Sequence, residues 1–473
     1  MPAFLFVFAQ AHSEFRLPEL ESIAELHGFT ISVPADCDPS RPFMVLNLES
    51  EEHARLLAAR CILIKHVYEF YAQGGDYDEL HIANKESKHL WSSYIQDTSF
   101  KFIVTAYNHK ISESRQREIV ESFRYMGFLG KIDMKNPEII LGCFEEYDTS
   151  LGLREDRDGK FRQAYFGRLV VDGSARALIK MFDVKKRLYY GNTSMESEVS
   201  LLMANQALAS PSRFVYDPFC GTGSMAYVGD ANFSVHTCLL HIAKPSAYFG
   251  AHVFGSDIDD QPPGVLRAAK QYGVGDRIVD LCTFDSLFDA IITDPPCKWS
   301  SSGGQKTGTK KKSSAMKRKR PISSINYRHG SKLSIFFGLI GIAERQYSAQ
   351  QPYLPPTKPY ELSLLVADLV VLARYLLKPG GRLVFFLPTV NEQYEEVDIQ
   401  TMLCEGMALV ANSLQDFGSW GRRDQLVTIR KSTHETYPPP SFGEEHDANG
   451  HVPAHRDFRD QYFRGFKKES DEV

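Results

Sequence analysis

Residues 214–223, FVYDPFCGTG, join a short apolar strand to a turn that opens with an acid and holds two glycines. Gly221 and Gly223 let the backbone approach a bound group closely, because glycine has no Cβ. Dinucleotide enzymes use the spacing GxGxxG, and an acid opening the turn would repel a pyrophosphate. Asp217 instead suits a nucleotide-like cofactor with an ammonium group and no phosphate, and S-adenosylmethionine is that cofactor. The alternative is a glycine turn that only starts a helix.

The next expected strand after this turn also ends in an acid. HVFGSD, residues 252–257, ends at Asp257, which we expect to accept hydrogen bonds from ribose hydroxyls. The alternative role for this acid is a helix N-cap. Asp285 is a candidate partner for an adenine amino group. Repeated strand, turn and helix units predict an α/β fold with a doubly wound, Rossmann-like sheet, in which ligands lie beyond the carboxyl ends of the strands.

The third strand, FDAIITDPP, ends in the most specific of these patterns, Asp294-Pro295-Pro296. Two prolines fix the backbone and remove two N–H donors, which leaves a carboxylate and carbonyl oxygens as acceptors. A planar nucleobase amino group donates two hydrogen bonds, so two acceptors could orient its nitrogen lone pair toward a methyl donor. Such catalysis would rest on positioning and needs no strong base. A strand terminator with a structural proline pair is the alternative interpretation.

The chain beyond this motif continues the α/β alternation. Residues 359–381 predict a long amphipathic helix closed by KPGG, and RLVFFLP follows as a buried strand. Residues 404–418 and 424–431 are expected to supply a helix and one or two closing strands. We assign residues 186–431 to the Rossmann-like domain and the polar residues 432–473 to a C-terminal tail.

Residues 1–185 predict an α+β region that precedes this domain. Strand-like and helical segments alternate there, and aromatic residues are interleaved with Lys and Arg. Residues 112–128 have helical spacing and begin with a serine cap. Residues 137–184 are expected to supply several strands, among them RALIKMFD, residues 176–183.

Composition limits the class of protein. The chain has 473 residues, a formal charge of −5 and eight cysteines with no CxxC pair. These cysteines suit a reducing compartment, the cytosol or the nucleus, and we expect a cytoplasmic protein; the sequence indicates no metal site. The start of the chain lacks the pattern of an export signal. Its longest apolar runs are shorter than the ~20 residues needed to cross a bilayer, so we expect no membrane association.

At this point the motifs resemble a known class. DPFCGTGS, GSDID and TDPP, in this order, are similar to amino-group methyltransferases with an (Asp/Asn)-Pro-Pro-(Tyr/Phe) motif. Segments such as AELHGF, YYGNTSMESEVSLLMANQAL and NSLQDFGSWGRR resemble the catalytic subunit of eukaryotic tRNA (guanine-10-N2) methyltransferases, a THUMP-domain family. The resemblance implies a ferredoxin-like region and a tRNA-binding THUMP domain in residues 1–185. It also implies an obligate small zinc-binding activator subunit.

The function expected from the motifs and the resemblance is methylation of the exocyclic N2 of a guanine, position 10, in tRNA. Asp294 and the Pro295 carbonyl would hold the amine at the catalytic turn. Asp217, Gly221, Gly223 and Asp257 would hold S-adenosylmethionine. The alternatives are a catalytically impaired tRNA-binding homologue and an amino-group methyltransferase with another substrate, such as DNA adenine or a protein glutamine.

The sequence departs from the family pattern at the catalytic turn. Cys297 stands where the family has an aromatic residue that stacks on the target base. Base–aromatic stacking is worth about 1–3 kcal/mol, so its loss would impair the site. In addition, Asp257 follows Asp217 by 40 residues, where such an acid normally follows by about 20.

Two irregular segments, residues 228–245 and 298–345, accompany this departure. Residues 298–343 carry 11 Lys or Arg residues and no acid, concentrated in the stretch 306–320. A basic loop on tRNA phosphates, a nuclear import signal and a solvated, unfolded loop are the open interpretations. A further hypothesis is that unspliced or mis-joined segments were translated into this sequence.

Overall fold

The computed structural model describes residues 1–107, 109–148, 159–183, 186, 195–218, 246, 248–255, 287–295, 362–390, 399–416 and 422–440. Contacts divide the chain into two compact units. The first unit comprises residues 1–186 and 197–208, and the second comprises residues 187–196 and 209–473. The helix α7 (Ser197–Gln206) is therefore grouped with the first unit, although it follows the domain boundary that we place after residue 185. That boundary stays a prediction.

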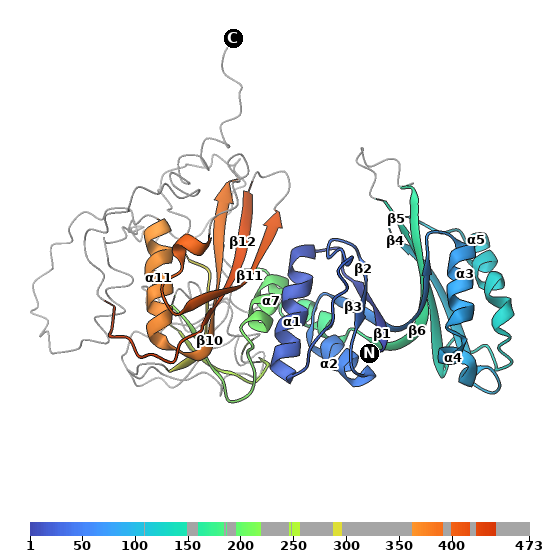
Figure 1. The fold of residues 1–473 in the computed structure, drawn as a ribbon, viewed down its shortest axis with the longest axis horizontal. Helices are drawn as coiled ribbons and strands as arrows, with labels where there is room; N and C mark the ends of the chain where they lie inside the picture. Colours follow the sequence, from blue (N-terminus) through green and yellow to red (C-terminus); the bar gives the residue numbers. More distant parts are fainter. Residues whose placement is uncertain are drawn as a thin grey trace, which may run out of the picture. The chain divides into compact units, whose positions relative to one another are not determined.

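The first unit is built on a six-stranded sheet in the order β2-β1-β3-β6-β5-β4 (Figure 1). Only β4 and β5 are parallel to each other, and the remaining neighbours are antiparallel. The strands are β1 (Ala3–Phe8), β2 (Phe43–Asn47), β3 (Ile64–Gly74), β4 (Phe100–Tyr107), β5 (Ile139–Tyr147) and β6 (Phe161–Asp172). This mixture confirms the α+β region predicted for the N-terminal part.

Seven α-helices accompany the sheet of the first unit in the described residues. They are α1 (Arg16–His27), α2 (Glu51–Arg60), α3 (Tyr77–Glu86), α4 (Lys88–Trp91), α5 (Glu113–Ser122), α6 (Ala177–Met181) and α7. Ser112 caps α5 as predicted, since its side chain accepts a hydrogen bond from the Arg115 N–H at 3.3 Å. The strand expected over residues 176–183 is wrong, because this segment forms α6.

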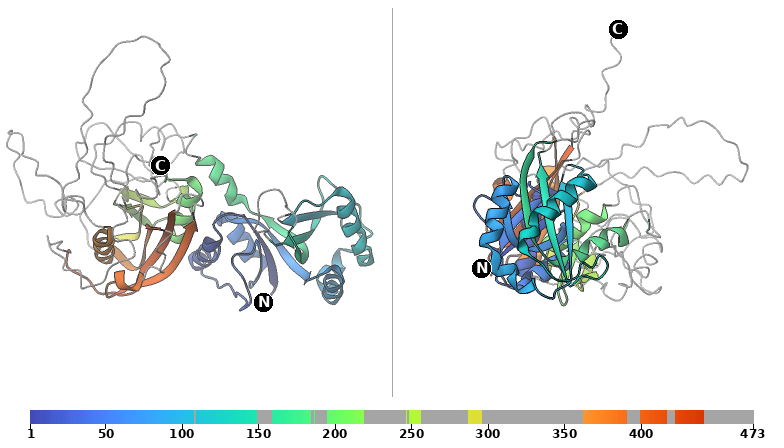
Figure 2. Two further views of the ribbon diagram at one scale, coloured as in Figure 1. Left: turned by 90° about the horizontal axis from the view of Figure 1, so that it is seen from above. Right: turned by 90° about the vertical axis from the view of Figure 1, so that its right-hand side faces the viewer.

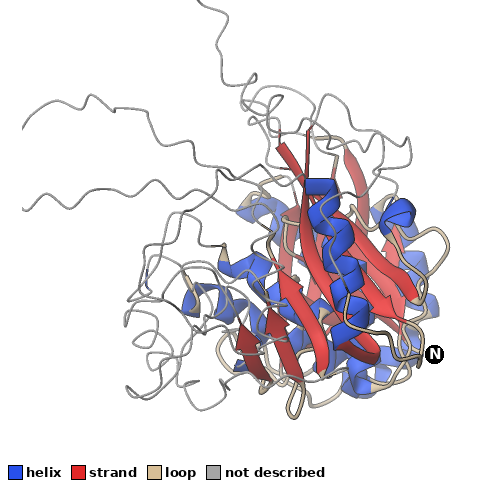
Figure 3. Ribbon diagram, turned by 90° about the vertical axis from the view of Figure 1, so that its left-hand side faces the viewer, coloured by secondary structure: helices blue, strands red, loops and turns tan. Residues whose placement is uncertain are grey.

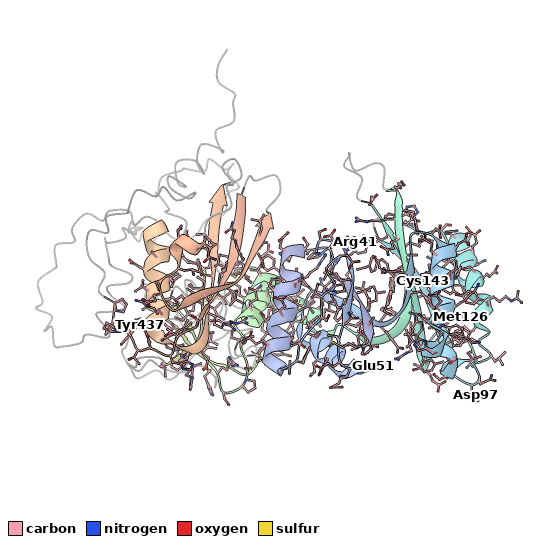
Figure 4. All side chains as sticks on the ribbon, in the orientation of Figure 1. Arg41, Glu51, Asp97, Met126, Cys143 and Tyr437 are labelled. Atoms are coloured by element: carbon pink, nitrogen blue, oxygen red, sulfur yellow. The ribbon has the colours of Figure 1, made fainter. Side chains whose placement is uncertain are left out.

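Two long strands, β3 and β6, tie the two ends of the first unit together. β3 pairs with β1 on one side and with β6 on the other, and β6 also pairs with β5. Arg168 of β6 is ion-paired with Glu51 of α2 and with Glu69 of β3, the latter at 3.0 Å. Glu51 is labelled in Figure 4, and α3, α4 and α5 lie together at one end of the first unit in the left panel of Figure 2.

An apolar core lies between the α3–α5 end of the sheet and its helices. It contains Trp91, Phe123, Leu141, Phe166 and further buried residues, among them Met126 and Cys143, which are labelled in Figure 4. The rings of Phe123 and Phe166 are stacked with centroids 4.2 Å apart. Burial of several aromatic side chains supplies most of the stabilisation in such a core.

The second unit contains a six-stranded sheet in the order β11-β12-β10-β9-β7-β8. The strands are β7 (Phe214–Asp217), β8 (His252–Gly255), β9 (Phe288–Thr293), β10 (Leu377–Val390), β11 (Met407–Asp416) and β12 (Arg422–Lys431). β8, β7, β9 and β10 run parallel, whereas β12 and β11 are antiparallel to their neighbours. The parallel strands confirm the predicted Rossmann-like α/β fold.

One long helix, α11 (Leu362–Leu376), covers a face of this sheet (Figures 1 and 3). Its buried residues Val366, Leu369 and Val370 belong to one cluster with Ile291 and Phe385 of the sheet. The helix predicted over residues 359–381 is thus present, but the described helix ends at Leu376. The helix expected within residues 404–418 is wrong, because most of that segment forms β11.

The first residues of the predicted tail, 432–440, lie against the second unit. The guanidinium carbon of Arg374 lies 4.0 Å from the centre of the Tyr437 ring, which Figure 4 labels. A cation at this distance over an aromatic face is attracted by its quadrupole. Across the described part of the chain, no helix is both long and apolar enough to span a membrane.

Candidate active site

The carboxyl ends of β7, β8 and β9 meet at one edge of the second sheet. Asp217 pairs in register with Gly255, and Tyr216 pairs with Ile291. In the sheet, β7 lies between β8 and β9. The chain runs from β7 to β8 and later returns to β9 on the opposite side of β7, so the strand order reverses between β7 and β9. Ligands of open α/β sheets bind beyond the strand ends at such a point. The start of the DPFCGTG motif, Asp217, and the start of the TDPP motif, Thr293, thus border this position.

A hydrogen bond joins these two motifs directly. The Thr293 hydroxyl donates to Asp217 Oδ1 at 2.9 Å, although the two residues are 76 positions apart. Thr293 is 0% exposed and Asp217 is 1% exposed. A buried carboxylate is costly without such donors, so Thr293 helps to hold the Asp217 side chain in one orientation.

The other end of β7 is also held by polar contacts. Asp289 Oδ2 accepts hydrogen bonds from the Phe214 backbone N–H and from Lys378 Nζ, both at 2.8 Å. Lys378 Nζ also lies 5.2 Å from the centre of the Phe214 ring. Because β7 has only four residues, contacts at both of its ends fix the position of Asp217.

Of the residues predicted for the site, the structure describes Asp217, Asp294 and Pro295. Asp294 is half-buried and Pro295 is buried, directly after the last residue of β9. The remaining site residues, Gly221, Gly223, Asp257, Asp285, Pro296 and Cys297, lie outside the described residues. Their roles stay predictions.

Sequence reasoning missed Thr293 and Asp289. Both are polar residues within the strand FDAIIT, whose other members are apolar. Polar residues are rarely buried without a hydrogen-bond partner, so a threonine next to Asp294 at a buried strand end was the available signal. Its partner, Asp217, could not be identified without the pairing of β7 with β9.

The first unit carries cations beside aromatic rings on the helices α3 and α5. Lys85 Nζ lies 4.9 Å from the centre of the Tyr125 ring, and the guanidinium carbon of Arg115 lies 5.2 Å from that of Tyr77. His81 contacts the Tyr125 hydroxyl at 3.2 Å. Arg115 is ion-paired with Glu118 at 3.0 Å and with Glu145 at 3.4 Å, so Lys85 beside Tyr125 is the combination of cation and aromatic ring that is typical of RNA-binding surfaces.

A family model and several known proteins are similar in sequence to this chain. A family model described as "Tmrp11 THUMP N-terminal domain" matches residues 2–176. The tRNA (guanine(10)-N(2))-methyltransferase of Saccharomyces cerevisiae is 31% identical over 490 residues, which cover 98% of this chain and 100% of the relative. The corresponding Xenopus laevis protein is 30% identical over 496 residues, with coverage of 98% and 92%.

The human protein of the same name is 28% identical over 501 residues, with coverage of 98% of this chain and 96% of the relative. Among solved structures, TrmN from Thermus thermophilus aligns over 91% of this chain and 99% of its own, at 16% identity and a TM-score of 0.39.

Proposed function

The chain belongs to the tRNA (guanine(10)-N(2))-methyltransferase family, and from that membership we propose that it methylates the exocyclic N2 of guanine 10 in tRNA. The relatives bear this activity in their names and match nearly the whole chain. The observation on the molecule itself that supports the proposal is the Thr293–Asp217 hydrogen bond. It joins the last residue of β7, where the DPFCGTG motif begins, to the last residue of β9, where the TDPP motif begins.

We propose S-adenosylmethionine as the methyl donor. When bound, it supplies a methyl group on a positively charged sulfur. The acids Asp217 and Asp294, at the ends of neighbouring parallel strands, suit a ligand with an ammonium group and a sulfonium, because both ligand charges are positive. Asp217 would accept from the ammonium group, while Gly221, Gly223, Asp257 and Asp285 complete the cofactor site in this proposal.

The target amine would be held at the catalytic turn. Asp294 and the Pro295 carbonyl offer two acceptors, and the guanine N2 amino group offers two donors. Holding both N–H groups directs the nitrogen lone pair at the methyl group, and orientation of this kind can supply a large part of a rate enhancement. Pro296 fixes the backbone of the turn. As the bond between the amine nitrogen and the methyl carbon forms, the bond between that carbon and the sulfur would break and leave a neutral thioether, and the amine proton would pass to the Asp294 carboxylate that holds it.

The first unit would bind tRNA through its THUMP region, since Lys85 and the exposed ring of Tyr125 suit a phosphate and an exposed base. We further propose that the chain is the catalytic subunit of a two-subunit cytoplasmic enzyme with a small zinc-binding activator. An α/β sheet with an uncovered edge strand tends to aggregate, so co-expression with the activator should raise solubility.

The test uses the full chain co-expressed with the activator and unmodified tRNA. We expect N2-methylguanosine at position 10 by nucleoside mass spectrometry, and no product from a matched tRNA with inosine at position 10, which lacks the N2 amino group. Asp294→Ala should remove the activity. Methylation of the inosine tRNA, or normal activity of Asp294→Ala, would contradict the proposal.

Cys297 favours a second candidate function, a tRNA-binding homologue with impaired methyl transfer, because the stacking residue of the family is absent. Calorimetry with S-adenosylmethionine in the presence of the activator separates the two. Binding with methyl transfer supports the enzyme, whereas tRNA binding without cofactor binding supports the second candidate.

A further inference from the structure

Hydrogen bonds anchor the Tyr125 side chain on the face formed by α3 and η3 (Phe123–Met126), the short helix that follows α5 (Figure 1). The Tyr125 hydroxyl accepts from Asn84 Nδ2 at 2.8 Å, and His81 Nδ1 lies 3.2 Å from the same hydroxyl. Asn84 is 0% exposed, and Trp91 Nε1 donates to its carbonyl at 3.1 Å. The tyrosine is thus held through a buried residue of α3.

The hydrogen bonds around His81 have one consistent direction. His81 Nε2 lies 3.0 Å from the Ser122 hydroxyl, which donates to the Ile119 carbonyl at 2.6 Å. Because that hydroxyl uses its proton on the carbonyl, it accepts from Nε2–H, and the neutral ring leaves Nδ1 as the acceptor for Tyr125. Burial and the charge of Lys85 lower the pKa of His81, which favours this neutral form. The tyrosine hydroxyl therefore has a defined partner on each side.

The Tyr125 ring is exposed although its hydroxyl is anchored. The residue is 37% exposed, whereas the neighbouring Phe123, with its ring centroid 6.3 Å away, is buried. A side chain that is fixed before binding loses little conformational entropy when a ligand packs on it. This face of the first unit therefore offers a flat aromatic surface at a low cost in entropy.

Lys85 supplies a cation beside this ring. Its Nζ lies 4.9 Å from the ring centroid, and unlike Arg115 it forms no ion pair with an acid in the described part of the chain. An exposed cation–π contact contributes about two- to fivefold to an equilibrium constant, and a base stacked on an aromatic ring contributes about 5- to 150-fold. A base can therefore displace the ammonium group from the ring and leave it free to meet a phosphate.

An unpaired nucleotide suits this pair of side chains. Bases within an A-form duplex are stacked on one another, whereas the bases of single-stranded segments can be splayed out and stacked on aromatic side chains. Stacking is tolerant of base identity, because every base has an aromatic face. The ring and the cation together thus select for single-stranded RNA and against a continuous duplex.

We propose that Tyr125 stacks on one unpaired base of the tRNA and that Lys85 binds a phosphate next to that base. Asn84 and His81 hold the ring and touch no RNA in this proposal. The inference rests on the proposed function, since it takes tRNA as the ligand of the first unit, and it adds the structural class of the nucleotide that this face binds.

The first test measures RNA binding by the full chain in complex with the activator, at one fixed salt concentration. Tyr125→Leu should raise the Kd for unmodified tRNA and for a short single-stranded RNA by about 5- to 150-fold. The Kd for a blunt RNA duplex should stay within about twofold of wild type. An unchanged Kd for the single strand would overturn the proposal, as would an equal loss of affinity for the duplex.

The matched control is Tyr94→Leu. The guanidinium carbon of Arg168 lies 5.4 Å from the centre of the Tyr94 ring, but Arg168 is ion-paired with Glu51 and Glu69. That cation is already neutralised, so the Kd for each RNA should stay within about twofold of wild type. A loss as large as that of Tyr125→Leu would contradict the assignment of stacking to Tyr125.

Two milder variants separate the contributions of the ring, the hydroxyl and the cation. Tyr125→Phe keeps the ring and loses its anchor, so the Kd for the single strand should rise by only about two- to fivefold. Lys85→Gln should reduce the slope of log Kd against log salt by about 0.7, the value for one phosphate of a single strand. A loss in Tyr125→Phe as large as in Tyr125→Leu would refute stacking, and an unchanged salt slope would refute the phosphate contact.

Ultraviolet crosslinking of the wild-type complex to tRNA needs no substitution and covers the case in which Tyr125→Leu does not fold. Mass spectrometry of the digested product should find a nucleotide attached to Tyr125, because a stacked ring and base are in direct contact. Crosslinks found only at other residues would overturn the proposal. Absence of methyl transfer by the wild-type complex would contradict the proposed function, and binding of the single strand would still decide the role of Tyr125.

Discussion

Replacing Thr293 by valine removes the hydroxyl that joins the two motifs and keeps the shape of the side chain. The hydroxyl donates to a carboxylate at 2.9 Å, and a hydrogen bond to a charged group contributes about 1.5–3 kcal/mol. Valine gains a buried methyl group, which offsets about 0.8 kcal/mol of the stability lost with the hydrogen bond. We therefore expect a net loss of about 1–2 kcal/mol in the free energy of unfolding of the second unit.

That loss is measurable as a change in melting temperature. For a unit of this size, 1 kcal/mol corresponds to about 2–4 °C, so Tm should fall by about 2–8 °C. The dissociation constant for S-adenosylmethionine should also rise, because Asp217 loses a group that orients it. Differential scanning calorimetry and titration calorimetry measure the two effects.

Thr293→Ser is the matched control, because serine keeps the hydroxyl and loses only a methyl group. It should retain the cofactor affinity of the wild type even if Tm falls slightly. If Thr293→Val and wild type had the same Tm and the same dissociation constant, the hydrogen bond would not hold Asp217 in the way that we argue.

Three further predictions concern the first unit. Ser112→Ala removes the N-cap of α5 and should lower the free energy of unfolding by about 1 kcal/mol in urea titrations, while an unchanged midpoint would show that the cap is dispensable. A fragment of residues 1–208 should melt at a higher temperature than a fragment of residues 1–185, because only the longer one contains α7, and equal melting temperatures would contradict the grouping of α7 with this unit. Burial holds the Glu19 pKa at about 7, above its model-compound value of 4.5, so folding takes up a proton. The stability contributed by Glu19 is present below pH 4.5 and lost as the pH rises through 7, by about 3 kcal/mol in all, and urea titrations of Glu19→Gln should lack that fall.

The α/β fold of the second unit could be predicted from the polar residues at the ends of its apolar strands. Asp217 ends one buried strand and Asp294 follows another, and parallel strands in one sheet place their carboxyl ends at one edge. The hydrogen bonds of Thr293 and Tyr125 could not be predicted in this way. Asn84 and Tyr125 are 41 positions apart, and only the folded chain shows that their side chains meet.

Two local predictions failed, in opposite directions: a helix was expected where β11 forms, and a strand was expected where α6 forms. Residues 407–416 contain Met, Ala, Leu and Gln, which favour helices, yet they pair with β12 along the edge of the sheet. Residues 176–183, RALIKMFD, contain mainly residues that favour helices, namely Arg, Ala, Leu, Lys and Met, and five of them form the short helix α6 between β6 and α7. Neither segment has a pattern long enough to decide its structure locally.

The pairing of β3 with β6 is delayed during synthesis of the chain, because β6 is made long after β3. β1, β2 and β3 are complete by residue 74, but the outer edge of β3 receives its partner only when β6 is made, up to residue 172. At roughly 5–20 residues per second, the ribosome needs on the order of 5–20 s for that interval. During that time an 11-residue strand presents unpaired backbone groups. The nascent chain is therefore most exposed to misassembly just before residue 161 emerges, and it is there that a chaperone would have the most to protect.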